Sequence, residues 1–181
     1  SGNLAKSGTG TLTLNGSNTY TGITTINAGT IQIGHANALG TTANITFSGG
    51  CLQYGTGITQ DLSGRIKNSN SAILVDTNGN NVTFASVLDS TNSGGFTKNG
   101  SGTLTLSANN TYTGTTTINT GTLQISSTGL LGGGNYSGNI ANSGTVIFGS
   151  TSNQTLGGVI SGTGALTKNG TGTLTLTGSN S

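Results

Sequence analysis

The chain has 181 residues, of which 34 are glycine and none is proline; 4% are charged, and the formal net charge is +2. Ordinary globular domains carry roughly 25% charged residues, and disordered chains combine low apolar content with high net charge or abundant proline. The chain fits neither class, and its five basic residues are scattered, which argues against nucleic acid as a partner. Its Leu, Ile and Val residues alternate with Thr, which is typical of β-strands.

One segment recurs three times along the chain. It reads KSGTGTLTLNGSNTYTGITTINAGTIQI over residues 6–33 and KNGSGTLTLSANNTYTGTTTINTGTLQI over residues 98–125, and a third copy, KNGTGTLTLTG, begins at Lys168. With the residues just before each lysine, the internal repeats cover residues 4–33, 96–125 and 166–181. The text between them is related in outline and weakest from residue 56 to residue 93.

The spacing of these copies predicts a recurring coil. Leu4, Phe96 and Leu166 hold equivalent places, and the two intervals between them are close to four and three times one common unit. Within the first copy TLTL begins at Thr11 and TIQI at Thr30, and the same interval separates TLTL from TLQI in the second copy. We therefore expect about eight coils of roughly 19–23 residues, each with two or three short strands separated by Gly, Asn and Ser turns.

A coil of this length cannot bury its own apolar side, but stacked coils can, because like residues then lie over one another in a continuous core. The sequence predicts an all-β fold, a right-handed single-stranded parallel β-helix (β-solenoid), with residues 1–181 forming one segment of a longer protein. The inward side of each strand should supply the core, from Leu12, Leu14, Ile26, Ile31, Ile33, Leu104, Leu106, Ile118, Leu123, Ile125, Leu174 and Leu176.

An antiparallel sandwich is the alternative fold. Asn99-Gly100 and Asn169-Gly170 lie between apolar runs, which is a hairpin signal. A sandwich, however, has no need of nearly identical text at multiples of one unit, so the solenoid is favoured.

Few residues offer chemistry. Asp61, Asp76 and Asp89 are the only acids and fall in different positions of the aligned coils, with Asp76 opposite the position of Tyr54, so no row of carboxylates is expected. His35 is the only histidine and has no companions for a triad or a metal site. We therefore expect no catalytic residue, no metal, no cofactor and no enzymatic activity.

The single cysteine and two repeated tyrosines have structural interpretations. Cys51 can form no internal disulfide and is expected to be a small buried residue. Tyr20 and Tyr112 hold the same place in NTYTG. They could form a repeated surface platform for sugar or protein, but a ring packed over a coil corner is the favoured interpretation.

The three copies and the linking text GGVISGTGALTKNG over residues 157–170 resemble the passenger-associated transport repeat of bacterial autotransporters. That resemblance implies a right-handed parallel β-helix in a secreted or surface-exposed passenger, which a C-terminal barrel in the parent usually anchors in the outer membrane. It implies a structural stalk segment that supports export and the presentation of an adhesin-like protein. The expected partners are neighbouring coils of the same chain and an unidentified host or cell-surface ligand.

Two other functions stay open from the sequence. Open strand edges could associate end to end into a surface fibre, because so little charge opposes contact. Outward Thr-x-Thr pairs, at residues 11–13, 103–105 and 173–175, could form a flat face that binds ice or glycans.

Overall fold

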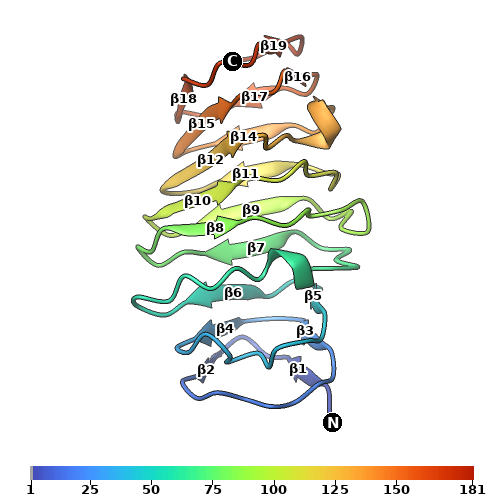
Figure 1. Cartoon of the computed structure of the whole chain (residues 1–181), viewed down its shortest axis with the longest axis vertical. Helices are drawn as coiled ribbons and strands as arrows, with labels where there is room; N and C mark the ends of the chain where they lie inside the picture. Colours follow the sequence, from blue (N-terminus) through green and yellow to red (C-terminus); the bar gives the residue numbers. More distant parts are fainter. Residues whose placement is uncertain (1) are drawn as a thin grey trace.

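The computed structural model describes residues 2–181 as a stack of parallel β-coils (Figure 1). The strands are β1 (Leu4–Lys6), β2 (Thr11–Leu14), β3 (Thr24–Ile26), β4 (Thr30–Ile33), β5 (Ile45–Phe47), β6 (Cys51–Tyr54), β7 (Ile73–Asp76), β8 (Val82–Phe84), β9 (Phe96–Asn99), β10 (Thr103–Leu106), β11 (Thr116–Ile118), β12 (Thr122–Ser127), β13 (Asn135–Tyr136), β14 (Ile140–Asn142), β15 (Thr145–Ser150), β16 (Gln154–Leu156), β17 (Ile160–Ser161), β18 (Ala165–Lys168) and β19 (Leu174–Leu176). Two short 3-10 turns are η1 (Ser63–Arg65) and η2 (Gly132–Gly134).

The strands line three faces of the stack, and every ladder between them is parallel. Face A is one sheet of eight strands in the order β2-β4-β6-β7-β9-β11-β14-β17. Face B holds β8-β10-β12-β15-β18, and face C holds β1-β3-β5 near one end and β13-β16-β19 near the other. In Figure 1, β5 and β16 lie on the same side of the stack, opposite the face B strands. The predicted β-solenoid is confirmed, since consecutive turns rather than hairpins pair with one another.

We number the coils by their strand on face A, from coil 1 at β2 to coil 8 at β17. Coil length varies with the loops. Thr11 pairs with Thr30 over a short coil, whereas Thr116 pairs with Ile140 over a longer one. That longer coil contains η2 and its glycine-rich loop, which adds residues without changing the register of the strands.

Alternation along the strands places the aliphatic residues inside. Eight of the residues expected in the core are at most 1% exposed: Ile26, Ile31, Ile33, Leu104, Leu106, Ile118, Leu123 and Ile125. Leu12, Leu14 and Leu174 are half-buried and Leu176 is 41% exposed, because they lie in the first and last coils described, which are covered on one side only. Each full burial of such a side chain contributes about 1.5–3 kcal/mol relative to exposure.

The three repeats do not lie above one another, contrary to the expectation of four and three whole coils. The first strand of each copy is β1 on face C, β9 on face A and β18 on face B. Successive copies are thus about four and one-third and three and one-third coils apart, and each begins one face further round the stack. Leu12, Leu104 and Leu174 therefore occupy three different sheets.

Within a copy, the structure is nevertheless the same. The β1–β3 and β2–β4 ladders of the first copy correspond to β9–β11 and β10–β12 of the second. Each repeat therefore encodes a local unit of rather more than one coil, and the length of the intervening text decides the face on which it starts.

Candidate functional site

A buried ammonium group marks the first corner of each full repeat. Lys98 is 0% exposed, and its Nζ donates hydrogen bonds to the carbonyl oxygens of Asn99 at 2.8 Å, Gly100 at 2.7 Å and Thr120 at 3.4 Å. Burial lowers the pKa of Lys98 to about 8, although the negative charge of Asp76 acts in the opposite direction. The bonds to Asn99 and Gly100 close the corner between faces A and B, and the bond to Thr120 holds the next coil to this corner.

The first and third copies repeat this corner on other faces. Lys6 is 8% exposed and donates to the carbonyl oxygens of Ser7 at 3.2 Å, Gly8 at 2.7 Å and Ala28 at 3.1 Å. Lys168 donates to the equivalent carbonyl oxygen of Gly170. Sequence reasoning treated these lysines only as scattered charges, yet their fixed place before the corner glycines was the signal for a shared structural role.

The second corner is closed by tyrosine. The hydroxyl of Tyr112 lies 2.8 Å from Thr116 Oγ1, which lies 2.7 Å from the hydroxyl of Tyr136. Tyr112 is 0% exposed, so it packs within the coil and offers no surface to a ligand. Tyr20, which is half-buried, makes the same 2.8 Å contact with Thr24.

Tyr136 was not identified from the sequence as a corner residue. It stacks on Tyr112 in an edge-on arrangement with ring centroids 5.9 Å apart. Residues 135–138 read NYSG, a shortened form of NTYTG, and this wording was the signal for a third corner tyrosine. A cavity of about 220 Å³ lies beside these two rings, lined largely by glycine and small polar residues. With both rings buried, the cavity offers no exposed aromatic face for a sugar to stack on.

The acidic residues accept hydrogen bonds from their own turns. Asp61 accepts from the backbone N–H and the hydroxyl of Ser63 at 2.9 and 2.6 Å, and Asp76 accepts from Asn78 N–H at 2.8 Å. The register pairs Asp76 with Gln53, so the expected position opposite Tyr54 was wrong by one residue. This slip moves Asp76 from an inward to an outward position, where its carboxylate belongs.

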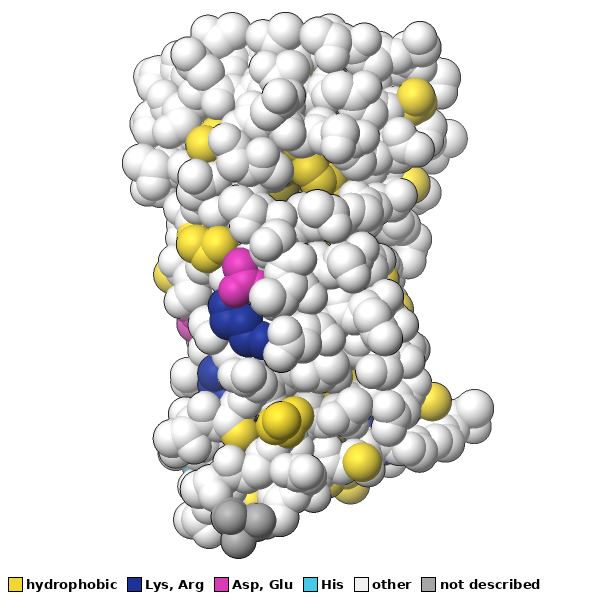
Figure 2. All heavy atoms as spheres, turned by 90° about the vertical axis from the view of Figure 1, so that its right-hand side faces the viewer, with side chains coloured by type: hydrophobic (Ala, Val, Ile, Leu, Met, Phe, Trp, Pro, Cys, Tyr) yellow, Lys and Arg dark blue, Asp and Glu magenta, His cyan; other side chains and the backbone are white. Residues whose placement is uncertain are grey.

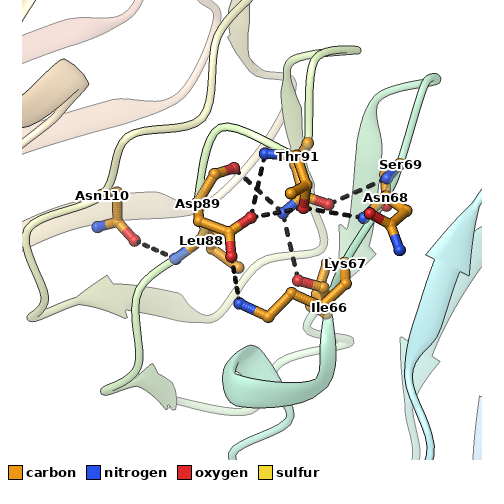
Figure 3. Close-up of polar contacts among 9 residues, drawn as sticks. Ile66, Lys67, Asn68, Ser69, Leu88, Asp89, Thr91 and Asn110 are labelled. Atoms are coloured by element: carbon orange, nitrogen blue, oxygen red, sulfur yellow. Dashed lines mark hydrogen bonds and ion pairs between the residues drawn. The ribbon is translucent and has the colours of Figure 1, made fainter.

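A single ion pair joins side chains in the described residues. Lys67 Nζ lies 2.5 Å from Asp89 Oδ2, and Asp89 Oδ1 accepts from the N–H and the hydroxyl of Thr91 at 3.1 and 2.5 Å (Figure 3). Both side chains are about one-third exposed. Figure 2 shows the face on which an acidic and a basic side chain meet, in a surface that is otherwise nearly without charge.

The remaining reactive groups are also engaged. Arg65 donates to three carbonyl oxygens of coil 2, those of Leu39 at 2.6 Å, Gly40 at 3.0 Å and Ala43 at 2.7 Å. Cys51 is only half-buried, at an outward position of β6, so the expectation of a fully buried residue was wrong. Its partial burial, reinforced by the charge of Asp76, raises the pKa of the thiol to about 12, so that the thiol stays protonated at neutral pH.

His35 lies in a turn, where its Nδ1 accepts the backbone N–H of Asn37 at 3.0 Å. From residue 2 to the end of the chain, no three His, Cys, Asp or Glu side chains lie close enough together to hold a metal ion. Over the same residues, no helix has the length and apolar character needed to cross a bilayer.

The outward threonine pairs are distributed around the stack. The pairs at residues 11–13, 103–105 and 173–175 lie on or beside β2, β10 and β19, which belong to three different faces. The repeats therefore build no single flat rank of threonine, which argues against an ice-binding face formed by these pairs. What the arrangement provides is a set of locked corners along a continuous shaft.

Comparison with known proteins agrees with this architecture. Residues 4–33, 96–125 and 166–181 match the family described as passenger-associated-transport-repeat. The chain is 42% identical to the adhesin BmaC autotransporter of Brucella suis biovar 1 (strain 1330) over 229 aligned residues, which take in 98% of this chain. The chain spans 6% of the length of that curated relative. No solved structure gives a significant match.

Proposed function

The chain is an autotransporter passenger segment with three passenger-associated transport repeats, and we propose that it serves as a non-enzymatic stalk that supports export and presents an adhesive part of its parent at the cell surface. The observation that carries the proposal is the unbroken eight-stranded sheet of face A, which runs from β2 to β17 through the first two repeats and ends just before the third. A shaft of this kind transmits position and force along its axis.

Charged and buried polar groups support a structural role. The ammonium and guanidinium groups of Lys6, Lys98 and Arg65 all donate to backbone carbonyls, and none faces a cleft with a second reactive group. Catalysis needs positioned groups that are free to act on a substrate. In the proposed role, these groups instead fasten one coil to the next.

Coil-by-coil contact also suits export. Each coil pairs only with its neighbours, so a chain that emerges unfolded can fold by adding one coil to the last. In this proposal, folding outside the cell pulls the remaining chain outward, and a C-terminal barrel of the parent provides the anchor.

The test replaces Gly29 and Gly121 with alanine in the full parent passenger and measures surface display by protease accessibility on intact cells. Both glycines have a left-handed backbone beside a lysine corner, so the substitutions should impair folding of the repeat units. We expect less passenger at the surface and more retained in the periplasm. Unchanged display, together with demonstrated misfolding of the isolated segment, would refute the export role.

A further inference from the structure

The joint between coil 3 and coil 4 is built differently from the joints above it. Its strand ladder lies on face A alone, where Cys51, Leu52 and Gln53 pair with Leu74, Val75 and Asp76. Coil 3 contributes no strand to face B or face C, where it has extended chain and η1. The next joint carries ladders on two faces, β7–β9 and β8–β10. Summed over the three faces, the stack therefore has its fewest strand pairings between coils 3 and 4.

Side-chain hydrogen bonds also cross this joint on faces A and B, and the acceptor on each of these faces is a carboxylate. On face A, Asp76 Oδ2 of coil 4 accepts a hydrogen bond from Gln53 Nε2 of coil 3 at 2.8 Å. On face B, Asp61 Oδ2 of coil 3 accepts from the backbone N–H of Ala85 in coil 4 at 3.0 Å. Each carboxylate is anchored in its own turn by its other oxygen, so it is aimed across the joint.

On face C, the third carboxylate bridges the same joint. Asp89 of coil 4 forms the ion pair with Lys67 of coil 3 (Figure 3). Beside it, the fully buried Asn92 of coil 4 accepts from Ser69 N–H at 3.2 Å and donates to the carbonyl oxygen of Ile66 at 3.2 Å. The three acidic side chains of the whole sequence thus span a single joint, one on each face.

We propose that this joint is an acid-sensitive clasp, at which the shaft opens first on acidification and separates residues 2–69 from residues 73–181. Protonation removes the charge that Asp89 presents to Lys67 and makes all three carboxyl groups weaker acceptors. No other joint contains a side-chain carboxylate, because the sequence has only these three, so acid acts on this one selectively. The inference goes beyond the stalk function, since a shaft without such a clasp would serve that function equally well.

The groups that face the carboxylates do not change charge in the same pH range. Lys67 faces Asp89, and Lys98 and Cys51 lie near Asp76. Tyr54 lies near Asp61, and its burial raises its pKa above the ordinary value. Lys98, whose pKa is lowered only to about 8, stays protonated in acid, and the thiol and the phenol, whose pKa values are raised, stay neutral. The carboxylates are therefore the groups at the joint on which acid acts.

The sign of the effect follows from Asp89. Its partial burial acts to raise the pKa, but the hydrogen bonds from Lys67 and Thr91 and the charge of Lys67 outweigh burial, and the pKa lies below its ordinary value of 3.8. A carboxyl group with a lowered pKa stabilises the fold at neutral pH, and this contribution is lost as the pH falls through the folded-state value. The clasp should therefore be closed at neutral pH and open as the pH falls below 3.8, through the lowered pKa of Asp89.

The test measures amide hydrogen exchange by mass spectrometry at about pH 7 and about pH 2.5, expressed as protection relative to the intrinsic rates at each pH. Peptides that cover residues 51–69 and 82–92 should lose protection about tenfold more in acid than peptides from β10, β12 and β15. Equal loosening throughout the stack, or selective loosening elsewhere, would overturn the proposal.

Variants separate the carboxylates from other acid effects. The triple substitution Asp61→Asn, Asp76→Asn and Asp89→Asn should lower protection at the joint at neutral pH and remove most of its further loss in acid. If that protein fails to fold, Lys67→Met removes the ion pair alone and should reproduce part of the same pattern. The matched control is Asn119→Ala, which removes the 2.8 Å bond to Asn99 between coils 5 and 6 and should leave the acid response unchanged. A wild-type acid response in both carboxylate-joint variants would refute the clasp.

Discussion

The second-copy lysine corner should tolerate no side chain at Gly121. This residue has φ +69°, a left-handed conformation, and a Cβ there would lie 2.5 Å from the carbonyl oxygen of Gly102 and 2.9 Å from Lys98 Nζ, with the oxygen of Gly100 closer still. Ordinary contacts of a Cβ begin at 3.4 Å. Alanine would therefore strain the backbone and also push against the ammonium group and against the carbonyl oxygen of Gly100 that binds it.

Gly57 provides a control that separates these two costs. It has φ +77°, close to that of Gly121, but a Cβ there would meet nothing within 4 Å. Gly57→Ala should therefore cost only the left-handed strain, about 1 kcal/mol. Gly121→Ala should add about 1–3 kcal/mol of overpacking, for a total of about 2–4 kcal/mol.

Urea unfolding followed by far-UV circular dichroism measures both losses in the same segment, from the shift in midpoint at constant m-value. A loss for Gly121→Ala that is clearly larger than the loss for Gly57→Ala supports the packed corner. Equal losses would mean that only backbone strain matters there, and the structural role assigned to the lysine corner would have to be abandoned.

Three further outcomes are expected. Lys98→Met should remove a pH dependence of stability. Because the pKa of Lys98 is lowered from 10.5 to about 8, the unfolded chain binds more protons than the folded chain between these pH values. The unfolding free energy of the wild type, measured by urea titration, should therefore rise relative to that of the variant by about 3 kcal/mol from pH 8 to pH 10.5. The half-buried Cys51 thiol should react with iodoacetamide at about pH 8 at least roughly a hundredfold more slowly in the folded than in the unfolded chain, since its pKa is about 12. Equal rates would contradict the raised pKa. Thr116→Val should lower the unfolding free energy by about 1–3 kcal/mol, because the buried hydroxyl of Tyr112 loses its hydrogen-bond partner. The hydroxyl of Tyr136 keeps its hydrogen bond to the carbonyl oxygen of Gly114. A loss near zero in thermal unfolding would show that the hydroxyl bridge is dispensable.

The coil and its core were predictable from the sequence because both are local. Alternation within TLTL fixes which side chains point inward, and the constant interval from TLTL to TIQI or TLQI fixes the pairing of the two strands. These features involve residues less than two coils apart. The solenoid follows from them without any knowledge of distant contacts.

The carboxylate joint was not predictable because its partners are set by the register between coils. Asp61 contacts the backbone of Ala85 in the next coil, and the chain between them matches the repeat wording least. An error of one residue in the pairing moved Asp76 from the position of Gln53 to that of Tyr54. A slip of one residue turns a side chain to the other side of a strand, so weak wording cannot locate such contacts.

The rotation of the repeats shows why near-identical text does not require an identical position around the axis. The lysine corner joins face C to face A in the first copy and face A to face B in the second, with the same carbonyl acceptors in each. Since one sequence folds equally well at both corners, the corners of the stack must offer nearly the same environment. The face on which a copy starts is then free to vary with loop length, so the lysine corners of the three copies fall at three different corners of the stack.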